Sequence, residues 1–163
     1  MTAPGLHAKR LRTYLNDHLA VASAGVALAK RSLGSNEGTP YESVLRRLHD
    51  DLEQDLGLMR EIMRTLDVGE DPLKQGLARL GEKLGRLKLN DSLTSYSPLS
   101  RTVELEGLMV VIGILRNTWA SLADVLADDA RVPDTTAARE RAEANLRDLD
   151  ALRPQAVREA LLS

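Results

Sequence analysis

Four polar side chains are predicted to lie on helix faces that are otherwise apolar. His18 falls within an apolar stripe of three- and four-residue steps in 8–33, and Asp55 falls within a similar stripe in 41–66, with Asp51 one turn earlier at its edge. Glu104 lies on a broad apolar face in 98–126. Neutral imidazole and carboxylates together can bind Fe, Mn or Zn. If the helices form one bundle, these four residues are candidate metal ligands.

The same residues have an interpretation without metal, which we favour. A buried charge needs a partner, so an interior histidine with acidic neighbours is typical of a hydrogen-bonded core network. A further alternative places these side chains near one end of the bundle, where they are partly exposed. Both alternatives leave the protein without a cofactor.

The histidines lack the motif of the common di-iron bundles. Those proteins carry Glu-x-x-His on two helices, because residues three apart share one helix face. The residues three positions before His7, His18 and His49 are Pro4, Leu15 and Arg46. A di-iron site of that kind is therefore not expected. The spacing of serines and histidines supports no catalytic triad either, so we predict no catalytic residue and favour a protein that is not an enzyme.

The elements that must position these side chains are all helical. Apolar residues recur at helical spacing over 8–33, 41–66, 72–89, 98–126 and 136–161. The segment 34–38, with a glycine at each end, is expected to end the first helix, and Thr39 with Glu42 to form a capping box for the second. Ser97 followed by proline is expected to start the fourth. Pro154 predicts a kink or an early end in the last helix.

We expect these helices to form a single domain over residues 1–163. The short connections within 8–66 and 98–161 predict two antiparallel hairpins. About thirty residues join the hairpins, and they contain the short helix 72–89. This connection is long enough for a crossover like that of ferritin-like four-helix bundles. A simple up-down bundle with the short helix as a lid is the alternative.

Composition excludes several classes of function. The chain has no cysteine, a net charge of −2 and only 2% aromatic residues, so we expect no thiolate site and no nucleic-acid partner. The N-terminus lacks the apolar run of a signal peptide. The most apolar stretch, 105–115, contains Glu106 and two glycines and is too short for a membrane span. We therefore expect a soluble, cytoplasmic protein.

Three further features concern partners. The segment 81–88 is basic and amphipathic, and it either contacts an anionic partner or packs on the bundle with its charges in water. Trp119, the single tryptophan, either anchors a dimer or packs inside against Pro133 or the last helix. The helix 98–126 is apolar on nearly every face, which predicts that it is the most buried helix and that the bundle forms a homodimer.

The chain resembles a group of uncharacterised ferritin-like bacterial proteins. The stretches that carry the resemblance are TYLNDHLAVASAGVALAKR, at 13–31, and LGEKLGRLKLNDSLTSYSPLSRTVELEGL, at 80–108. The resemblance implies the four-helix fold and the crossover topology. It implies no activity, and the missing Glu-x-x-His motifs set the chain apart from ferroxidases and oxygenases.

These observations give one leading functional hypothesis and two alternatives. The leading hypothesis is a non-enzymatic helical bundle that acts through protein–protein contact, as a homodimer. The first alternative is a ferritin-like metal-binding protein with a reduced site of His18, Asp51, Asp55 and Glu104. The second is a sensor with an apolar ligand held between the helices.

Overall fold

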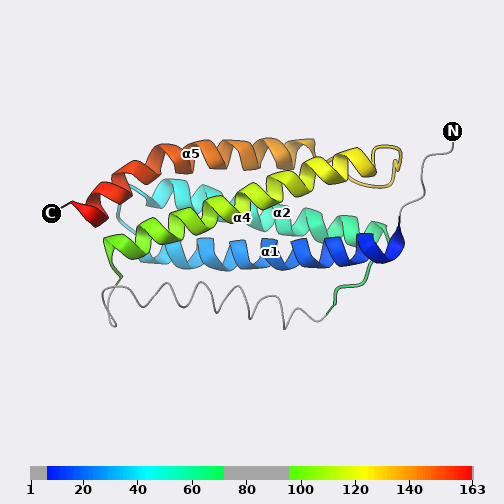
Figure 1. Cartoon of the computed structure of the whole chain (residues 1–163), viewed down its shortest axis with the longest axis horizontal. Helices are drawn as coiled ribbons and strands as arrows, with labels where there is room; N and C mark the ends of the chain where they lie inside the picture. The colour runs from blue at the N-terminus through cyan, green and yellow to red at the C-terminus, as the bar shows by residue number, and fades with distance from the viewer. Residues whose placement is uncertain (1–6, 72–95, 163) are drawn as a thin grey trace.

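The computed structural model describes residues 7–71 and 96–162, which form four long helices and no strand (Figure 1). The helices are α1 (Ala8–Ser35), α2 (Glu42–Thr65), α4 (Pro98–Val125) and α5 (Thr136–Leu161). The predicted all-α fold with four packed helices is confirmed. The predicted helix 72–89 and the basic segment 81–88 lie outside the described residues.

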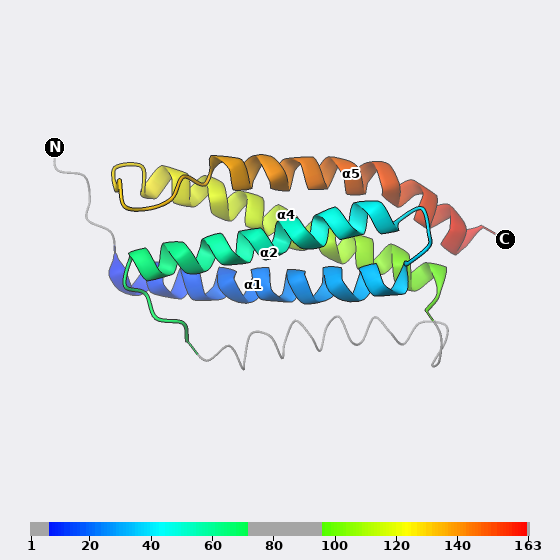
Figure 2. The same ribbon diagram turned by 180° about the vertical axis from the view of Figure 1, so that it is seen from behind.

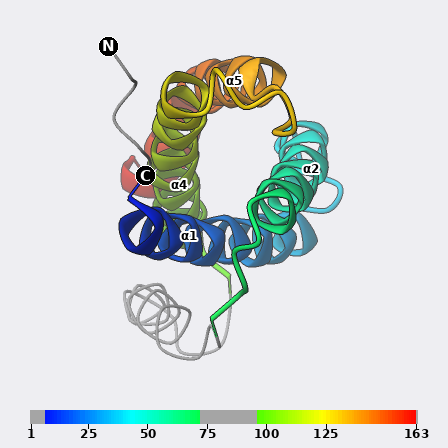
Figure 3. The same ribbon diagram turned by 90° about the vertical axis from the view of Figure 1, so that its right-hand side faces the viewer.

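The four helices form two antiparallel hairpins, α1 with α2 and α4 with α5 (Figures 1 and 2). Seen end-on, α1 lies beside α2 and α4, while α5 lies beside α4 and α2 (Figure 3). The α4–α5 contact is the most extensive, and the α2–α5 contact is the smallest of the four. Because α4 begins at the end of the bundle opposite to where α2 stops, α2 and α4 run parallel (Figure 1).

The predicted start of α4 is confirmed, and α1 ends within the predicted segment 34–38. Ser97 Oγ accepts a hydrogen bond from the Ser100 backbone N–H at 3.1 Å, and a proline follows it in the first helical turn. Helix α1 continues through Gly34 and ends at Ser35. The residue with a left-handed backbone is Gly38, at a φ of 73° in the α1–α2 turn.

The predicted capping box of α2 does not form, because the helix begins at Glu42 with Tyr41 as its N-cap, and Tyr41 makes no side-chain cap hydrogen bond. The Glu42 carboxylate accepts from the backbone N–H of Gly38 at 2.7 Å rather than from that of Thr39. Thr39 Oγ1 accepts from the Tyr41 N–H at 3.3 Å. Helix α5 continues past Pro154 to its end at Leu161, so an early end at the proline is wrong.

The core consists of two apolar clusters along the bundle. The larger cluster contains Leu45, Leu48 and Leu52 of α2, and the smaller contains Met59, Ile62 and Met63. Leu and Ala residues of the other helices fill most of the rest, together with Val111 and Ile112 in the larger cluster and Trp119 in the smaller. Within the larger one, α1 and α4 approach so closely that a Cβ added to Gly25 would lie 2.7 Å from Val111 Cγ1.

Helix α4 exposes an apolar face, although it has as many buried residues as α1 and more than α2 or α5, so the predicted deep burial of α4 is shared with α1. Val110 is 63% exposed, Ile114 is 37% exposed and Val125 is 51% exposed. A helix that is apolar all round has no polar face to turn to water, so its packing against α1 and α5 leaves apolar residues outside. We define the outward face of α4 as Glu106, Val110, Gly113, Ile114, Asn117, Ser121, Asp124 and Val125.

By length and composition, α4 could also cross a membrane. It is the one such helix in the part of the chain that the structure describes, and a core helix of a soluble bundle passes the same test. The absence of a membrane span therefore stays a prediction.

Candidate functional site

A row of three polar pairs joins α2 to α5, along the interface with the smallest helix contact. Arg47 pairs with Asp148, Asn145 Nδ2 donates to Asp51 Oδ2 at 3.0 Å, and Arg141 Nη2 donates to Asp55 Oδ1 at 2.7 Å. The steps of four residues on α2, and of three and four residues on α5, keep the members on one face of each helix. We call Arg47–Asp148, Asp51–Asn145 and Asp55–Arg141 the polar seam.

Asp55 is the most deeply buried acidic group of the seam, with 3% of the residue exposed. It lies one turn from Leu52 of the larger core cluster and one turn from Met59 of the smaller, so a carboxylate lies on α2 between residues of the two clusters. Burial raises the pKa of the Asp55 carboxyl above its ordinary value, and the Arg141 guanidinium opposes that rise.

Trp119 lies in the core and contacts the seam. The residue is fully buried, its indole N–H donates to Asp55 Oδ2 at 3.4 Å, and its backbone oxygen accepts from Thr135 Oγ1 at 2.9 Å. These contacts with α2 and with the start of α5 favour the second of its two predicted roles. A side chain with no exposed surface cannot anchor a dimer, so that alternative is wrong.

The chemistry of the seam is that of charge neutralisation. Arg141 keeps its positive charge at all physiological pH values, and it donates directly to the buried Asp55 carboxylate. In a carboxylate metal centre, the ion supplies the positive charge at such a position. Here a guanidinium supplies it, and Asn145 similarly satisfies Asp51.

Of the four candidate ligands, only Asp51 and Asp55 lie together, on the seam. His18 is half-buried, with its Nδ1 2.7 Å from the Tyr14 backbone oxygen and its ring centroid 4.0 Å from that of Tyr14. Glu104 accepts from Arg31 Nε at 2.9 Å on another interface. Within residues 7–71 and 96–162, no group of three or more His, Asp or Glu residues is placed to hold a metal ion.

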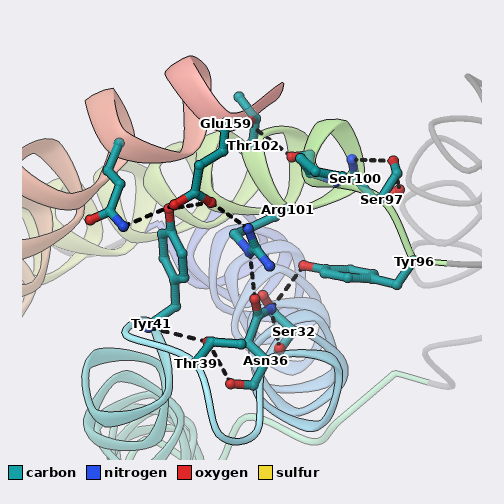
Figure 4. A network of polar contacts seen from close by, with 12 residues as sticks. Ser32, Asn36, Thr39, Tyr41, Tyr96, Ser97, Ser100, Arg101, Thr102 and Glu159 are labelled. Atoms are coloured by element: carbon teal, nitrogen blue, oxygen red, sulfur yellow. Dashed lines mark hydrogen bonds and ion pairs between the residues drawn. The ribbon is translucent and has the colours of Figure 1, made fainter. Parts of the chain in front are cut away.

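A second polar cluster, which we call the end network, closes the bundle at the α1–α2 turn (Figure 4). Its centre is Arg101, whose Nε donates to Asn36 Oδ1 and whose Nη1 donates to Glu159 Oε2, each at 2.6 Å. The guanidinium carbon lies 4.5 Å from the centroid of the Tyr41 ring, and Tyr41 also donates to Glu159. One arginine of α4 thus joins the α1–α2 turn to α5.

Tyr96 extends the end network toward Glu104. Its hydroxyl accepts from Asn36 Nδ2 at 2.8 Å and donates to Glu104 Oε2 at 3.0 Å (Figure 4 shows the Asn36 bond). Burial and the Glu104 charge raise the pKa of the Tyr96 hydroxyl to about 12, so the phenol stays a donor at neutral pH.

The sequence reasoning missed the partners of these acidic residues. Arg141 and Asn145 lie beside Ala142 and Leu149 on the inward face of α5, so their position in the apolar stripe was the available signal. The helices could be assigned from the sequence, but the pairing of α2 with α5 could not. Without that pairing, no residue of α5 could be matched to Asp55.

No family model, curated protein or solved structure matches this chain. The ferritin-like resemblance therefore stays a prediction.

Proposed function

We propose that this protein is a non-enzymatic four-helix bundle that acts through protein–protein contact, as a homodimer formed by the outward face of α4. The observation that carries the proposal is the exposure of Val110, Ile114 and Val125 on that face. Between Glu106 and Asp124, the only charged side chain of α4 is Arg116, which is half-buried at the edge of this face. Soluble helices normally turn charged residues to water, so this face is suited to burial.

Helix α2 provides the internal comparison. Most of its exposed positions are charged, namely Arg46, Arg47, Asp50, Glu53, Arg60, Glu61 and Arg64. Both helices belong to the same bundle and have similar lengths, with 24 residues in α2 and 28 in α4. The difference in exposed charge between α2 and α4 therefore supports a partner, rather than water, against the outward face of α4.

The ion pair at Asp55 supports a role without metal. A guanidinium already neutralises the most buried carboxylate, and the other candidate ligands have separate partners. No contact in the described part of the chain favours the alternative of Fe, Mn or Zn on His18, Asp51, Asp55 and Glu104. We expect substoichiometric metal by elemental analysis of protein purified without chelator. A stoichiometric metal whose thermal stabilisation is lost in His18→Ala would favour the alternative.

We also propose the ferritin-like topology for this bundle. Its support is the parallel direction of α2 and α4, which requires the chain between them to cross from one end of the bundle to the other (Figure 1). The proposed role in protein contact does not depend on this topology.

Sedimentation equilibrium over a range of micromolar concentrations tests the homodimer. We expect the wild type to dimerise and the variant with Val110→Glu and Ile114→Glu to be monomeric, because both carboxylates would have to lose water in the interface. Gln54→Glu, at an exposed position of α2, is the matched control and should dimerise normally. Circular dichroism checks that each variant is folded. A monomeric wild type at all concentrations would refute the proposal.

A further inference from the structure

We infer that the two copies pair through antiparallel α4 helices about a two-fold axis near Ile112, with Glu106 of each copy close to Arg116 of the other. This inference rests on the proposed function, because it specifies the geometry of that dimer. The partner that covers the outward face of α4 is then a second copy of the same chain. The argument uses the charges at the edges of this face and the space around Gly113.

The charges disfavour the other ways of pairing this face. In a parallel pair, Glu106 would lie next to Glu106 of the second copy, and Arg116 next to Arg116. In an antiparallel pair centred on Leu115, Glu106 would face Asp124. Like charges that face each other in an interface are unfavourable. An antiparallel pair centred near Ile112 avoids each of these encounters.

A two-fold axis near Ile112 also places the apolar residues of the two copies opposite one another. Val110 of one copy then faces Ile114 of the other, and the symmetry repeats this contact on the opposite side of the axis. Glu106 faces Thr118, which is only two residues, or about 3 Å along the helix, from Arg116. Opposite charges therefore flank the apolar centre at both ends.

Arg116 is available for a new partner, and Glu106 has only a long ion pair, with Arg153. Within the described residues Arg116 makes no ion pair, and its guanidinium donates only to Oδ1 of the neighbouring Asn117, at 3.0 and 3.2 Å. The Glu106 side chain is 52% exposed, and its carboxylate lies 3.9 Å from Arg153. Exposed pairs contribute little affinity, so their expected role is to select the orientation of the two helices.

Gly113 lies at the predicted crossing point of the helices. A Cβ added there would have no heavy atom within 4 Å, so the space beside its backbone is open. Glycine in a helix is less favourable than alanine by about 1 kcal/mol. Close packing of a second helix against this backbone would account for the glycine, because a larger side chain would hold the two helices apart.

The absence of cysteine makes disulfide cross-linking a direct test. A single Gly113→Cys substitution places a thiol next to the proposed axis, where it can pair with the same residue of the second copy. We expect oxidation to give a covalent dimer. Gly57→Cys is the matched control, because Gly57 is also a helical glycine with no heavy atom within 4 Å of an added Cβ. It should remain largely monomeric on a denaturing gel.

Charge reversal gives a second, independent readout. Glu106→Arg and Arg116→Glu should each weaken the dimer by roughly tenfold, because symmetry repeats the affected pair. The double variant should recover most of the wild-type affinity, since the pair is restored with its charges exchanged. Sedimentation equilibrium measures all four proteins at the same salt concentration.

The outcomes separate this geometry from the proposed function. A dimer in sedimentation that neither cross-links at Gly113→Cys nor recovers in the double charge reversal would overturn the antiparallel α4 pair and leave the homodimer proposal in place. A monomer in sedimentation would overturn both. A cross-link in Gly57→Cys as strong as that in Gly113→Cys would indicate random collision and would count against the geometry.

Discussion

Replacing Arg141 by methionine should destabilise the bundle by about 3 kcal/mol at neutral pH. Methionine keeps much of the length of the side chain but leaves the Asp55 carboxylate, whose side chain is 5% exposed, without its cation. Removing one member of a buried ion pair costs about 3–5 kcal/mol, and the 22% exposure of the Arg141 side chain places the expected value at the lower end. With a urea m value of about 2 kcal/mol/M, the unfolding midpoint should fall by about 1.5 M.

The cost should depend on pH, and its sign follows from the Asp55 pKa. Burial raises that pKa in the folded state above the ordinary value of 3.8, and removal of Arg141 should raise it further. A group with a raised folded-state pKa stabilises the fold below its unfolded-state pKa and loses that effect as the pH rises through the folded-state value. The penalty of Arg141→Met should therefore shrink as the pH falls from neutral toward 3.8.

Urea unfolding followed by far-ultraviolet circular dichroism measures both effects at one fixed protein concentration, because dimerisation adds to apparent stability. Arg147→Met, at an exposed position of the same helix, is the control and should change stability by no more than about 0.5 kcal/mol. Asp55→Leu combined with Arg141→Met should be less destabilising than Arg141→Met alone, since no buried charge remains and only the Trp119 indole N–H loses its acceptor. A cost of Arg141→Met below about 1 kcal/mol, or one that does not change with pH, would refute this reasoning.

Two further predictions concern packing and alkaline pH. Gly25→Ala should lower the free energy of unfolding by about 1–3 kcal/mol, because the new methyl group would lie 2.7 Å from Val111 Cγ1 and overpack the core. Gly57→Ala should raise the free energy of unfolding by up to about 1 kcal/mol, because alanine has the higher helix propensity and the added methyl group meets no other atom. Equal shifts in urea unfolding would contradict the close α1–α4 approach. Stability should also decline as the pH rises from 10 to about 12, because the unfolded chain releases the Tyr96 proton before the folded chain does. Tyr96→Phe should remove part of that decline, and an unchanged pH profile would argue against the buried phenol.

The helices could be predicted from the sequence because their signals are local. Apolar stripes at helical spacing placed each of the four described helices within two residues of its observed ends. The Ser97 cap was also correct, since it depends on neighbours within one turn. The end of α1 also falls within the predicted segment 34–38, with the last helical residue at Ser35 and the left-handed backbone at Gly38.

The polar contacts were harder to predict, because they join residues far apart in the chain. The angular position of Asp55 and Glu104 on their helices correctly indicated burial. Their partners depend on which helices are neighbours and on the alignment along the bundle axis. Asp55 pairs with Arg141, 86 residues away, whereas Glu104 pairs with Arg31, 73 residues away. The sequence pattern of one helix contains neither fact, so it could favour separate pairs over a shared metal centre but could not name the partners.

The polar seam has a consequence for how uniquely the helices are aligned. A slide of α5 along α2 by one turn, about 5.4 Å, still sets leucine and alanine against apolar neighbours. Such a slide in one direction would place Asp55 opposite Ala138, and in the other it would place Arg141 opposite Met59. Either displacement leaves a buried charge without its counterion, which costs several kcal/mol. Apolar packing alone permits several offsets between these helices, and the three pairs of the seam allow only one.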